Sequence, residues 1–294
     1  MTDKMNSDYP SQRIRIIVPL PQGGPADILA RMVAQKLAAS WGVEVVVENP
    51  VGGDTIVGTS IVAKAAPDGY TLLVVPSQFT VHPRQRATLP YDVIRDFAPV
   101  ILMALGPNVL VVHPSVPVNS IQDLTALAKS KPGVLRYATG GPGSTSHVTA
   151  EKLKGLAGID IVAVHYQGAA PATEAILAGE TQMLFSVMAP TIPHVQAGKL
   201  KALAVTGPNR SRAIPNCPTM KEAGFPALEI TTWQGLLAPA GTAPEVIMKL
   251  NREVARILRE PDVQQKLTAK GFELAGGTPE EFAARIKMET GMTV

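Results

Sequence analysis

The amino-acid sequence predicts an α/β protein of two domains, and three observations carry that prediction. Strand-like and helix-like segments alternate along the chain, as they do in sheets built from parallel strands. The length of 294 residues is about twice that of a typical domain. The same motif, a strand followed by a Gly-Gly-Pro loop and a helix, occurs at residues 13–37 and again at residues 135–156. Each half of the chain therefore contains one copy of the motif.

The first βαβ unit illustrates how the elements are assigned. Residues 13–18 form a short β-branched run, and a cluster of glycines and prolines follows at residues 21–25. Apolar residues then recur at helical spacing from residue 27 to residue 37, and Gly42 ends this helix. Residues 43–47 read as the next strand, which completes the unit.

The same alternation continues to the end of the chain. Further strands are expected at residues 71–75, 109–112, 135–138, 159–164, 183–187 and 200–205, and helices through 63–66 and at 120–130, 144–156, 171–178 and 193–197. The last three helices, at 244–259, 261–270 and 279–289, each begin with a proline, which suits a first helical turn.

Composition excludes several classes of protein. Apolar residues make up 46% and charged residues 17% of the chain, which excludes a disordered protein or a coiled coil. The net charge of +3 is spread over scattered residues and aromatics are only 4%, so no nucleic-acid partner is expected. The single cysteine, Cys217, and five histidines without metal-ligand spacing predict neither a disulfide nor a metal site, and no cofactor is expected.

The chain shows no targeting or membrane segment of its own. No apolar run reaches the length of about 18 residues that a membrane span needs. Residues 1–9 lack the apolar segment of a signal peptide. We therefore expect a protein that is cytoplasmic as written, or one whose export signal has been removed.

The two matching loops are the best candidates for a binding site. Each leads into a helix N-terminus, where unpaired backbone N–H groups and a partial positive charge favour an anion. Ser144, Thr145 and Ser146 add three hydroxyls at the second loop, more than one helix cap needs. In the first loop, Asp27 either orders the loop and its waters or complements the helix dipole. Two domains that present such loops to each other would form a cleft for an anion.

An enzyme remains an alternative at this point. The second loop lacks the glycine spacing of a dinucleotide-binding fingerprint, the lysine of a P-loop and the G-x-S-x-G of a nucleophile elbow. A serine-dependent hydrolase or transferase would use Ser144 or Ser146 with His147 or His165 as base. Cys217 has no neighbouring base in the sequence, so no catalytic role is expected for it.

The chain resembles the Bug/TctC family, the extracytoplasmic solute receptors of tripartite tricarboxylate transporters. The resemblance extends from about Tyr9 to Glu289 and rests on many ordered motifs. These are Tyr9-Pro10, Pro-Gln-Gly-Gly-Pro-Ala-Asp at 21–27, Val46–Asn49, Ala65–Leu73, Leu89-Pro-Tyr-Asp, Asp96–Val100, Asn108–Pro114, Gly143–His147, Ala197–Thr206, Pro218-Thr with Glu222-Ala-Gly, and Gly235–Thr242.

The resemblance implies a two-lobed, type II-like periplasmic binding protein, in which each lobe is a mainly parallel sheet flanked by helices and the ligand lies in the cleft between them. Lobe 1 would comprise residues 1–105 and 228–294, and lobe 2 residues 106–227, with hinges near residues 103–107 and 225–230. The implied function is non-catalytic: a monomer in the periplasm captures a small di-, tri- or aromatic carboxylate and delivers it to a membrane permease. A soluble signalling protein of the same fold that contacts a sensor is the other alternative.

The resemblance also implies which residues contact the ligand. They are Pro21, Gln22, Gly23, Gly24 and Asp27 of the first loop, Gly143, Ser144, Thr145, Ser146 and His147 of the second, Ser77, Gln78, Phe79 and Thr80, and Tyr166, Gly168, Ala169 and Ser186. Gln22 stands where the family usually has a small residue. Ser186 stands where many members carry an aspartate that suits a ligand amine, so an unaminated carboxylate is favoured.

Overall fold

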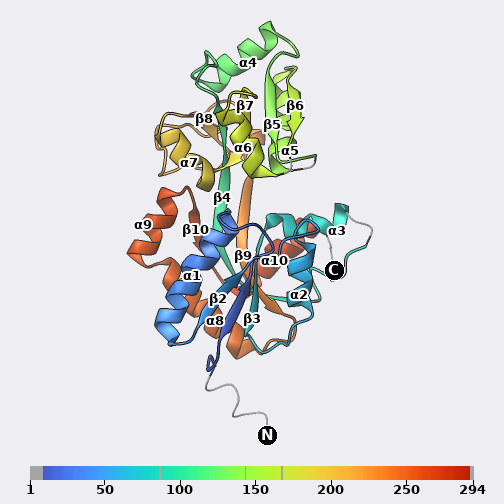
Figure 1. The fold of residues 1–294 in the computed structure, drawn as a ribbon, viewed down its shortest axis with the longest axis vertical. Helices are drawn as coiled ribbons and strands as arrows, with labels where there is room; N and C mark the ends of the chain where they lie inside the picture. The colour runs from blue at the N-terminus through green and yellow to red at the C-terminus, as the bar shows by residue number, and fades with distance from the viewer. Residues whose placement is uncertain (1–8, 86–87, 143, 167, 292–294) are drawn as a thin grey trace. The chain divides into compact units, whose positions relative to one another are not determined.

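The computed structural model describes residues 9–85, 88–142, 144–166 and 168–291 (Figure 1). Its internal contacts divide the chain into two units: unit 1 comprises Met1–Leu105, Trp233–Leu267 and Glu273–Val294, and unit 2 comprises Gly106–Thr232 and Thr268–Phe272. The chain passes between them inside two strands, β4 (Phe97–Val112) and β9 (Thr231–Pro239), and again at either end of Thr268–Phe272. Within the described ranges, no helix combines the length and apolar character that a membrane span requires.

The division differs in detail from the expected lobe limits. Residues 228–232, expected in the first lobe, belong to unit 2, because Ile230 donates its N–H to Thr206 O and Thr232 donates its hydroxyl to Gly106 O. Thr268–Phe272 also joins unit 2, where Gly271 lies against the Met188 side chain.

Unit 1 contains three successive strand–helix pairs followed by a C-terminal group of helices. Its elements, besides parts of β4 and β9, are β1 (Ile14–Ile17), α1 (Pro25–Trp41), β2 (Val45–Glu48), α2 (Ile56–Ala63), β3 (Thr71–Pro76), the 3₁₀ helix η1 (Ser77–Thr80), α3 (His82–Gln85), α8 (Pro244–Leu258), α9 (Pro261–Ala269), β10 (Glu273–Gly276) and α10 (Pro279–Thr290).

The sheet of unit 1 has the order β2-β1-β3-β9-β4-β10. β1 pairs in parallel with both β2 and β3, whereas β9 and β10 pair antiparallel with β3 and β4. The carboxyl ends of β1, β2 and β3 therefore lie at one edge, and the segments that follow these strands meet there. A core of Ile17, Leu73, Trp233 and Phe282 packs α2 and α10 onto one face.

Unit 2 repeats the strand–helix alternation. Its elements, besides parts of β4 and β9, are α4 (Ile121–Ser130), β5 (Arg136–Thr139), α5 (Thr145–Ala157), β6 (Val162–His165), α6 (Ala169–Leu177), β7 (Met183–Val187), α7 (Met188–Gln196), β8 (Lys201–Val205) and the 3₁₀ helix η2 (Pro226–Leu228).

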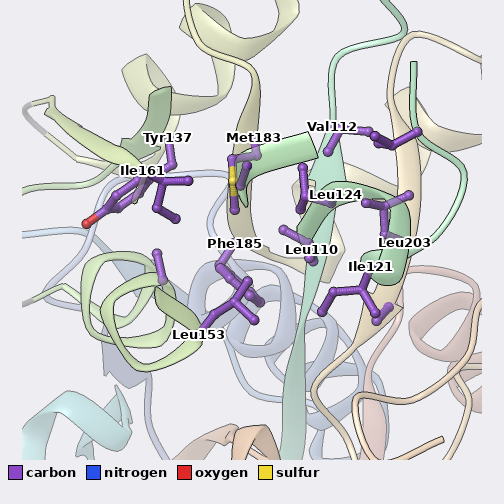
Figure 2. Close-up of a cluster of buried hydrophobic side chains, with 14 of the residues drawn as sticks. Leu110, Val112, Ile121, Leu124, Tyr137, Leu153, Ile161, Met183, Phe185 and Leu203 are labelled. Carbon is purple, nitrogen blue, oxygen red and sulfur yellow. The ribbon is translucent and has the colours of Figure 1, made fainter. Parts of the chain in front are cut away.

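The sheet of unit 2 has the order β8-β4-β7-β5-β6, in which β5 pairs in parallel with β6 and β7 and β4 pairs antiparallel with β7 and β8. Figure 2 shows one of its two cores, where side chains of β4, β5, β7 and β8 meet those of α4 and α5. Leu153 of α5 points toward Phe185 of β7 in this core, which fixes α5 over the sheet (Figure 2).

The predicted α/β fold class is confirmed, with both sheets mixed because the connecting strands run antiparallel. Several predicted elements were wrong in extent. The helix expected through 63–66 lies at Ile56–Ala63, where Gly58 is needed because a Cβ there would stand 2.7 Å from Pro19 Cβ. The helix expected at 193–197 begins five residues earlier, at Met188. β4 is 16 residues long where only 109–112 was expected.

Candidate functional site

The loop from β5 to α5 in unit 2 is held by its own hydroxyls. Ser144 caps α5: its Oγ accepts from His147 N–H and donates to Gly141 O at 2.7 Å. Ser146 Oγ lies 3.0 Å from Ser144 Oγ and accepts from Gly140 N–H at 3.1 Å. These two hydroxyls therefore shape the loop, whereas the Thr145 side chain is exposed.

The loop from β6 to α6 lies directly beside it. Gly168, at φ 115°, precedes the first turn of α6, and a Cβ on Gly140 would stand 3.3 Å from Ala169 N. Thr139 joins the two loops, because its Oγ1 accepts from Gly141 N–H and lies 2.8 Å from Nδ1 of His165. Close packing of these glycine-bearing loops is what brings the N-termini of α5 and α6 together.

Backbone amides are the groups that this edge of unit 2 offers to a ligand. By helix geometry the first amides of α5, those of Thr145 and Ser146, have no partner inside the helix. The same holds for Ala169 and Ala170 at the start of α6. Two converging helix N-termini create a positive potential without any fixed cation, which favours a carboxylate or another small anion.

Two imidazole rings and the hydroxyls of Tyr166 and Ser186 are the other predicted groups of this part of unit 2. The imidazoles of His147 and His165 meet edge to face, with centroids 5.0 Å apart. The Tyr166 hydroxyl donates to Glu180 at 3.3 Å, so its polar end is directed to that carboxylate. Ser186 at the end of β7 is 5% exposed and accepts from the Thr191 hydroxyl at 2.7 Å, so its side chain is engaged within unit 2.

The loop from β1 to α1 in unit 1 is organised by Asp27. This carboxylate is 2% exposed and accepts from Gly23 N–H at 2.9 Å, from Arg31 Nε at 3.0 Å and from Asn49 Nδ2 at 3.0 Å. Asn49 also donates to Leu20 O, so Asp27 and Asn49 together fasten both ends of the loop. The sequence left two roles for Asp27, ordering of the loop or interaction with the helix dipole. These hydrogen bonds show that Asp27 orders the loop.

The charge state of Asp27 follows from these contacts. Burial by itself raises the pKa of the carboxyl, and the hydrogen bonds from Arg31, Gly23 and Asn49 outweigh burial, so the pKa lies below its ordinary value. The ionised Asp27 carboxylate holds the exposed part of the loop, Pro21–Gly23, through its hydrogen bond from Gly23 N–H. No side chain caps α1 at Gly24, and the amides of Ala26 and Asp27 have no partner inside the helix.

η1 follows β3 at the same edge of unit 1. Gln78 is half-buried and donates from Nε2 to Asp54 Oδ1 at 2.7 Å. Phe79 is 1% exposed and packs against Tyr91 and Phe97 in the core. Of the four residues of η1, Ser77 and Gln78 are therefore the ones whose side chains are accessible at this edge.

Glu289 of the C-terminal helix α10 holds η1 in place. Its Oε2 accepts from Trp233 Nε1 at 2.8 Å and from Thr80 Oγ1 at 3.1 Å. Glu289→Gln keeps one acceptor and loses the charge, so we expect unit 1 to lose about 1 kcal/mol of stability. Denaturant unfolding followed by tryptophan fluorescence measures this, because Trp41 and Trp233 both lie in unit 1. Exposed Lys287→Gln on the same turn is the control, and equal midpoints for the two variants would contradict this role.

The structure groups the predicted residues by unit. In unit 1 the β1–α1 loop and η1 lie at one sheet edge, and in unit 2 the β5–α5 and β6–α6 loops do so; Gly143 lies outside the described residues. Phe79, Thr80 and Ser186 have buried side chains. Sequence reasoning missed Thr139, Asn49 and Asp54, which position these loops; the signal for Thr139 was a polar residue at the last position of a strand.

The geometry at the second loop differs from that of an activated serine, whose hydroxyl bonds to a base. Ser144 and Ser146 bond to loop backbone and to each other, and His165 Nδ1 faces Thr139. Burial raises the pKa of the Cys217 thiol to about 12, so it carries almost no thiolate. Among the described residues, no three His, Cys, Asp or Glu side chains gather as a metal site would require.

Comparison with known proteins gives a consistent result. Residues 29–290 match the TctC family, described as the tripartite tricarboxylate transporter family receptor. Rpa4515 of R. palustris, solved with adipate, is 34% identical, with a TM-score of 0.88 over 96% of this chain and 95% of that one. BugD, described as a periplasmic binding protein, is 30% identical, with a TM-score of 0.84 over 96% of this chain and 95% of that one.

A third solved structure, MatC from Rhodopseudomonas palustris with bound malate, is 29% identical, with a TM-score of 0.81 over 96% of this chain and 98% of that one. These neighbours are binding proteins and not enzymes, which agrees with the hydrogen bonding of Ser144 and Ser146. The chain therefore belongs to the TctC family of solute-binding receptors, and its fold is that of periplasmic binding proteins.

Proposed function

We propose that this protein captures a small organic carboxylate, and that the amides at the N-termini of α5 and α6 bind its carboxylate group. The single observation that carries the proposal is the convergence of these helix starts at Gly140, which donates its N–H to Ser146 of α5 and lies against Ala169 of α6. Hydrogen bonds to a charged group contribute about 1.5–3 kcal/mol each, so two to three amides contribute about 3–9 kcal/mol, and only the upper end of this range corresponds to micromolar affinity.

The remaining contacts are proposed for each unit separately. In unit 2, Thr145 and His147 lie in the first turn of α5, and Tyr166 directly follows β6. In unit 1, the loop from Pro21 to Gly24 and the side chains of Ser77 and Gln78 offer donors and acceptors at their own sheet edge. In this proposal the ligand's hydrogen-bond partners are hydroxyls and backbone amides. Binding of an anion would then need few lysine or arginine side chains.

Membership of the TctC family supports a proposal for the biological setting. We propose that the protein works in the periplasm as a monomer, and that it delivers its ligand to the membrane permease of a tripartite tricarboxylate transporter. The known ligands of solved neighbours, adipate and malate, are both dicarboxylates, which supports a carboxylate ligand for this chain.

A thermal-shift screen over carboxylates tests the proposal. Di-, tri-, hydroxy- and aromatic carboxylates are compared with the amide of each compound, which has the same shape and no charge. A carboxylate at one hundred times its Kd stabilises the protein by about 2.7 kcal/mol, so its melting temperature rises by several degrees. We expect this rise for a subset of the acids and for none of their amides. Equal rises with acids and amides, or no rise with any acid, would refute carboxylate capture.

A further inference from the structure

His165 stands at the end of β6, between the starts of α5 and α6 in unit 2. Its ring meets that of His147, in the first turn of α5, edge to face with centroids 5.0 Å apart. The next residue, Tyr166, donates its N–H to Thr139 O, and α6 begins shortly after, at Ala169. The His165 side chain is exposed. A ligand group held by the first amides of α5 and α6 would therefore lie near this ring.

One nitrogen of the His165 ring is engaged inside unit 2. Its Nδ1 lies 2.8 Å from Oγ1 of Thr139, a fully buried side chain whose Oγ1 also accepts the N–H of Gly141 at 3.0 Å. A threonine hydroxyl carries one hydrogen, and within the described part of the chain Nδ1 of His165 is the acceptor that faces it. If Nδ1 carried the ring proton, the hydroxyl hydrogen of Thr139 would be buried without an acceptor, which costs free energy.

This contact assigns the proton of the neutral His165 ring to Nε2. Thr139 donates to Nδ1, so Nε2 is the protonated nitrogen of the neutral imidazole. Nε2 points away from Thr139 and has no partner among the residues that the structure describes. A general base would instead need its unprotonated nitrogen to face a nucleophile. His165 therefore offers a hydrogen-bond donor, and not a base, beside the starts of α5 and α6.

We propose that His165, with its tautomer fixed by Thr139, is a ligand-binding residue whose Nε2–H donates to the carboxylate held at the starts of α5 and α6. The inference rests on the proposed function and adds one neutral side-chain donor to the backbone donors. An ionised carboxylate has about four lone-pair sites, so it can accept from these amides and from His165 together. An ammonium group could accept from none of them, so this part of unit 2 selects acceptor groups.

Three substitutions of His165 test the role of Nε2. Calorimetric Kd values are measured for malate, adipate, citrate and benzoate, and the acid that binds the wild type most tightly is used for every variant. His165→Phe keeps a ring against His147 and removes the donor, so binding should weaken at least about tenfold. His165→Gln places an uncharged amide N–H near the position of Nε2 and should stay within about threefold of the wild type. His165→Asn, whose amide reaches only the position of Nδ1, should weaken binding as much as His165→Phe does.

His113→Phe is the matched control. His113 also places Nδ1 beside a hydroxyl, that of Ser115 at 2.7 Å, but it follows the end of β4 that pairs with the first residue of β7, at the opposite edge of the sheet. The Kd should be unchanged in this variant. If His165→Phe binds as tightly as the wild type, the inference is wrong while carboxylate capture stands. If His165→Gln loses as much affinity as His165→Phe, a neutral N–H is not the ligand's partner and the inference is wrong. If the wild type binds none of the four acids, both proposals are contradicted.

Imidazole ¹⁵N NMR tests the tautomer of His165 without any ligand. The long-range ¹H–¹⁵N spectrum is recorded for the wild type at a pH where the ring is neutral, and His165→Phe identifies its signals by their loss. We expect Nε2 of His165 to resonate as a protonated nitrogen and Nδ1 as an unprotonated one. The opposite tautomer would overturn the inference, whatever the affinities of the variants.

Discussion

Asp27→Ala is expected to lower the stability of unit 1 by about 2–3 kcal/mol and to abolish measurable ligand binding. The substitution leaves three donors, Gly23 N–H, Arg31 and Asn49, without their shared buried acceptor. Tryptophan fluorescence during denaturant unfolding measures the loss, because Trp41 and Trp233 report on unit 1. Calorimetry with the best acid of the screen measures binding.

Asp262→Ala provides the matched control for this prediction. Asp262 is also an acid in the first turn of a helix, but its side chain is 48% exposed and its lysine partners can return to water. Its removal should move the unfolding midpoint far less than Asp27→Ala does. Equal effects would mean that Asp27 acts only through the helix dipole.

The loss of folding stability caused by Asp27→Ala should also depend on pH. Because the folded-state pKa of Asp27 lies below its ordinary value of about 3.9, the carboxylate stabilises the fold above that pH. This stabilisation is lost as the pH falls through the folded pKa. The stability difference between wild type and Asp27→Ala should therefore be constant near neutrality and shrink below about pH 4. A difference that grows in acid would contradict the depressed pKa.

Thr145→Pro is expected to weaken carboxylate binding about ten- to a hundredfold while the fold is retained. Proline removes the Thr145 amide, and it is well tolerated at the first position of a helix. The preceding residue, Ser144, already has ψ 157°, a conformation compatible with a following proline. The lost hydrogen bond to a charged group accounts for the size of the effect. Calorimetry gives the Kd ratio, and melting temperature reports the fold.

Thr145→Val distinguishes the contribution of the Thr145 backbone amide to ligand binding from that of its side-chain hydroxyl. Valine keeps the backbone N–H and removes only the side-chain oxygen, so it should cost much less affinity than proline does. If the two variants weaken binding equally, the hydroxyl and not the amide is the ligand's partner. If neither weakens binding, α5 does not hold the carboxylate.

Sequence alone predicted the regular features of this fold well. Strand–helix alternation, the repeated loop plan and the proline starts of α8, α9 and α10 are local signals, and the structure has these elements within a few residues. The helix expected at 120–130 is α4, and Ser120, its first expected residue, caps it by accepting from Asp123 N–H. These signals work because capping and periodicity depend on neighbours in the sequence.

The features that sequence missed depend on distant partners. Asp27 was ambiguous because Asn49, which shows that it fastens the loop, lies 22 residues away. Ser144 and Ser146 were expected to be surplus hydroxyls, whereas the loop folds back so that Gly140 and Gly141 bond to them. The start of α7 was predicted five residues too late, at Pro193, because a proline often begins a helix. In the structure the helix begins at Met188 and continues through Pro193.

The measurement that tests the account most directly is an amide ¹H–¹⁵N NMR titration with the best-binding carboxylate of the screen. Amides that donate to a carboxylate move downfield, and their shifts saturate together with the binding isotherm. We expect the amides of Thr145, Ser146 and Ala170 to show the largest downfield shifts in unit 2. Saturating shifts that leave these three amides unchanged would contradict the assignment of the carboxylate to the starts of α5 and α6.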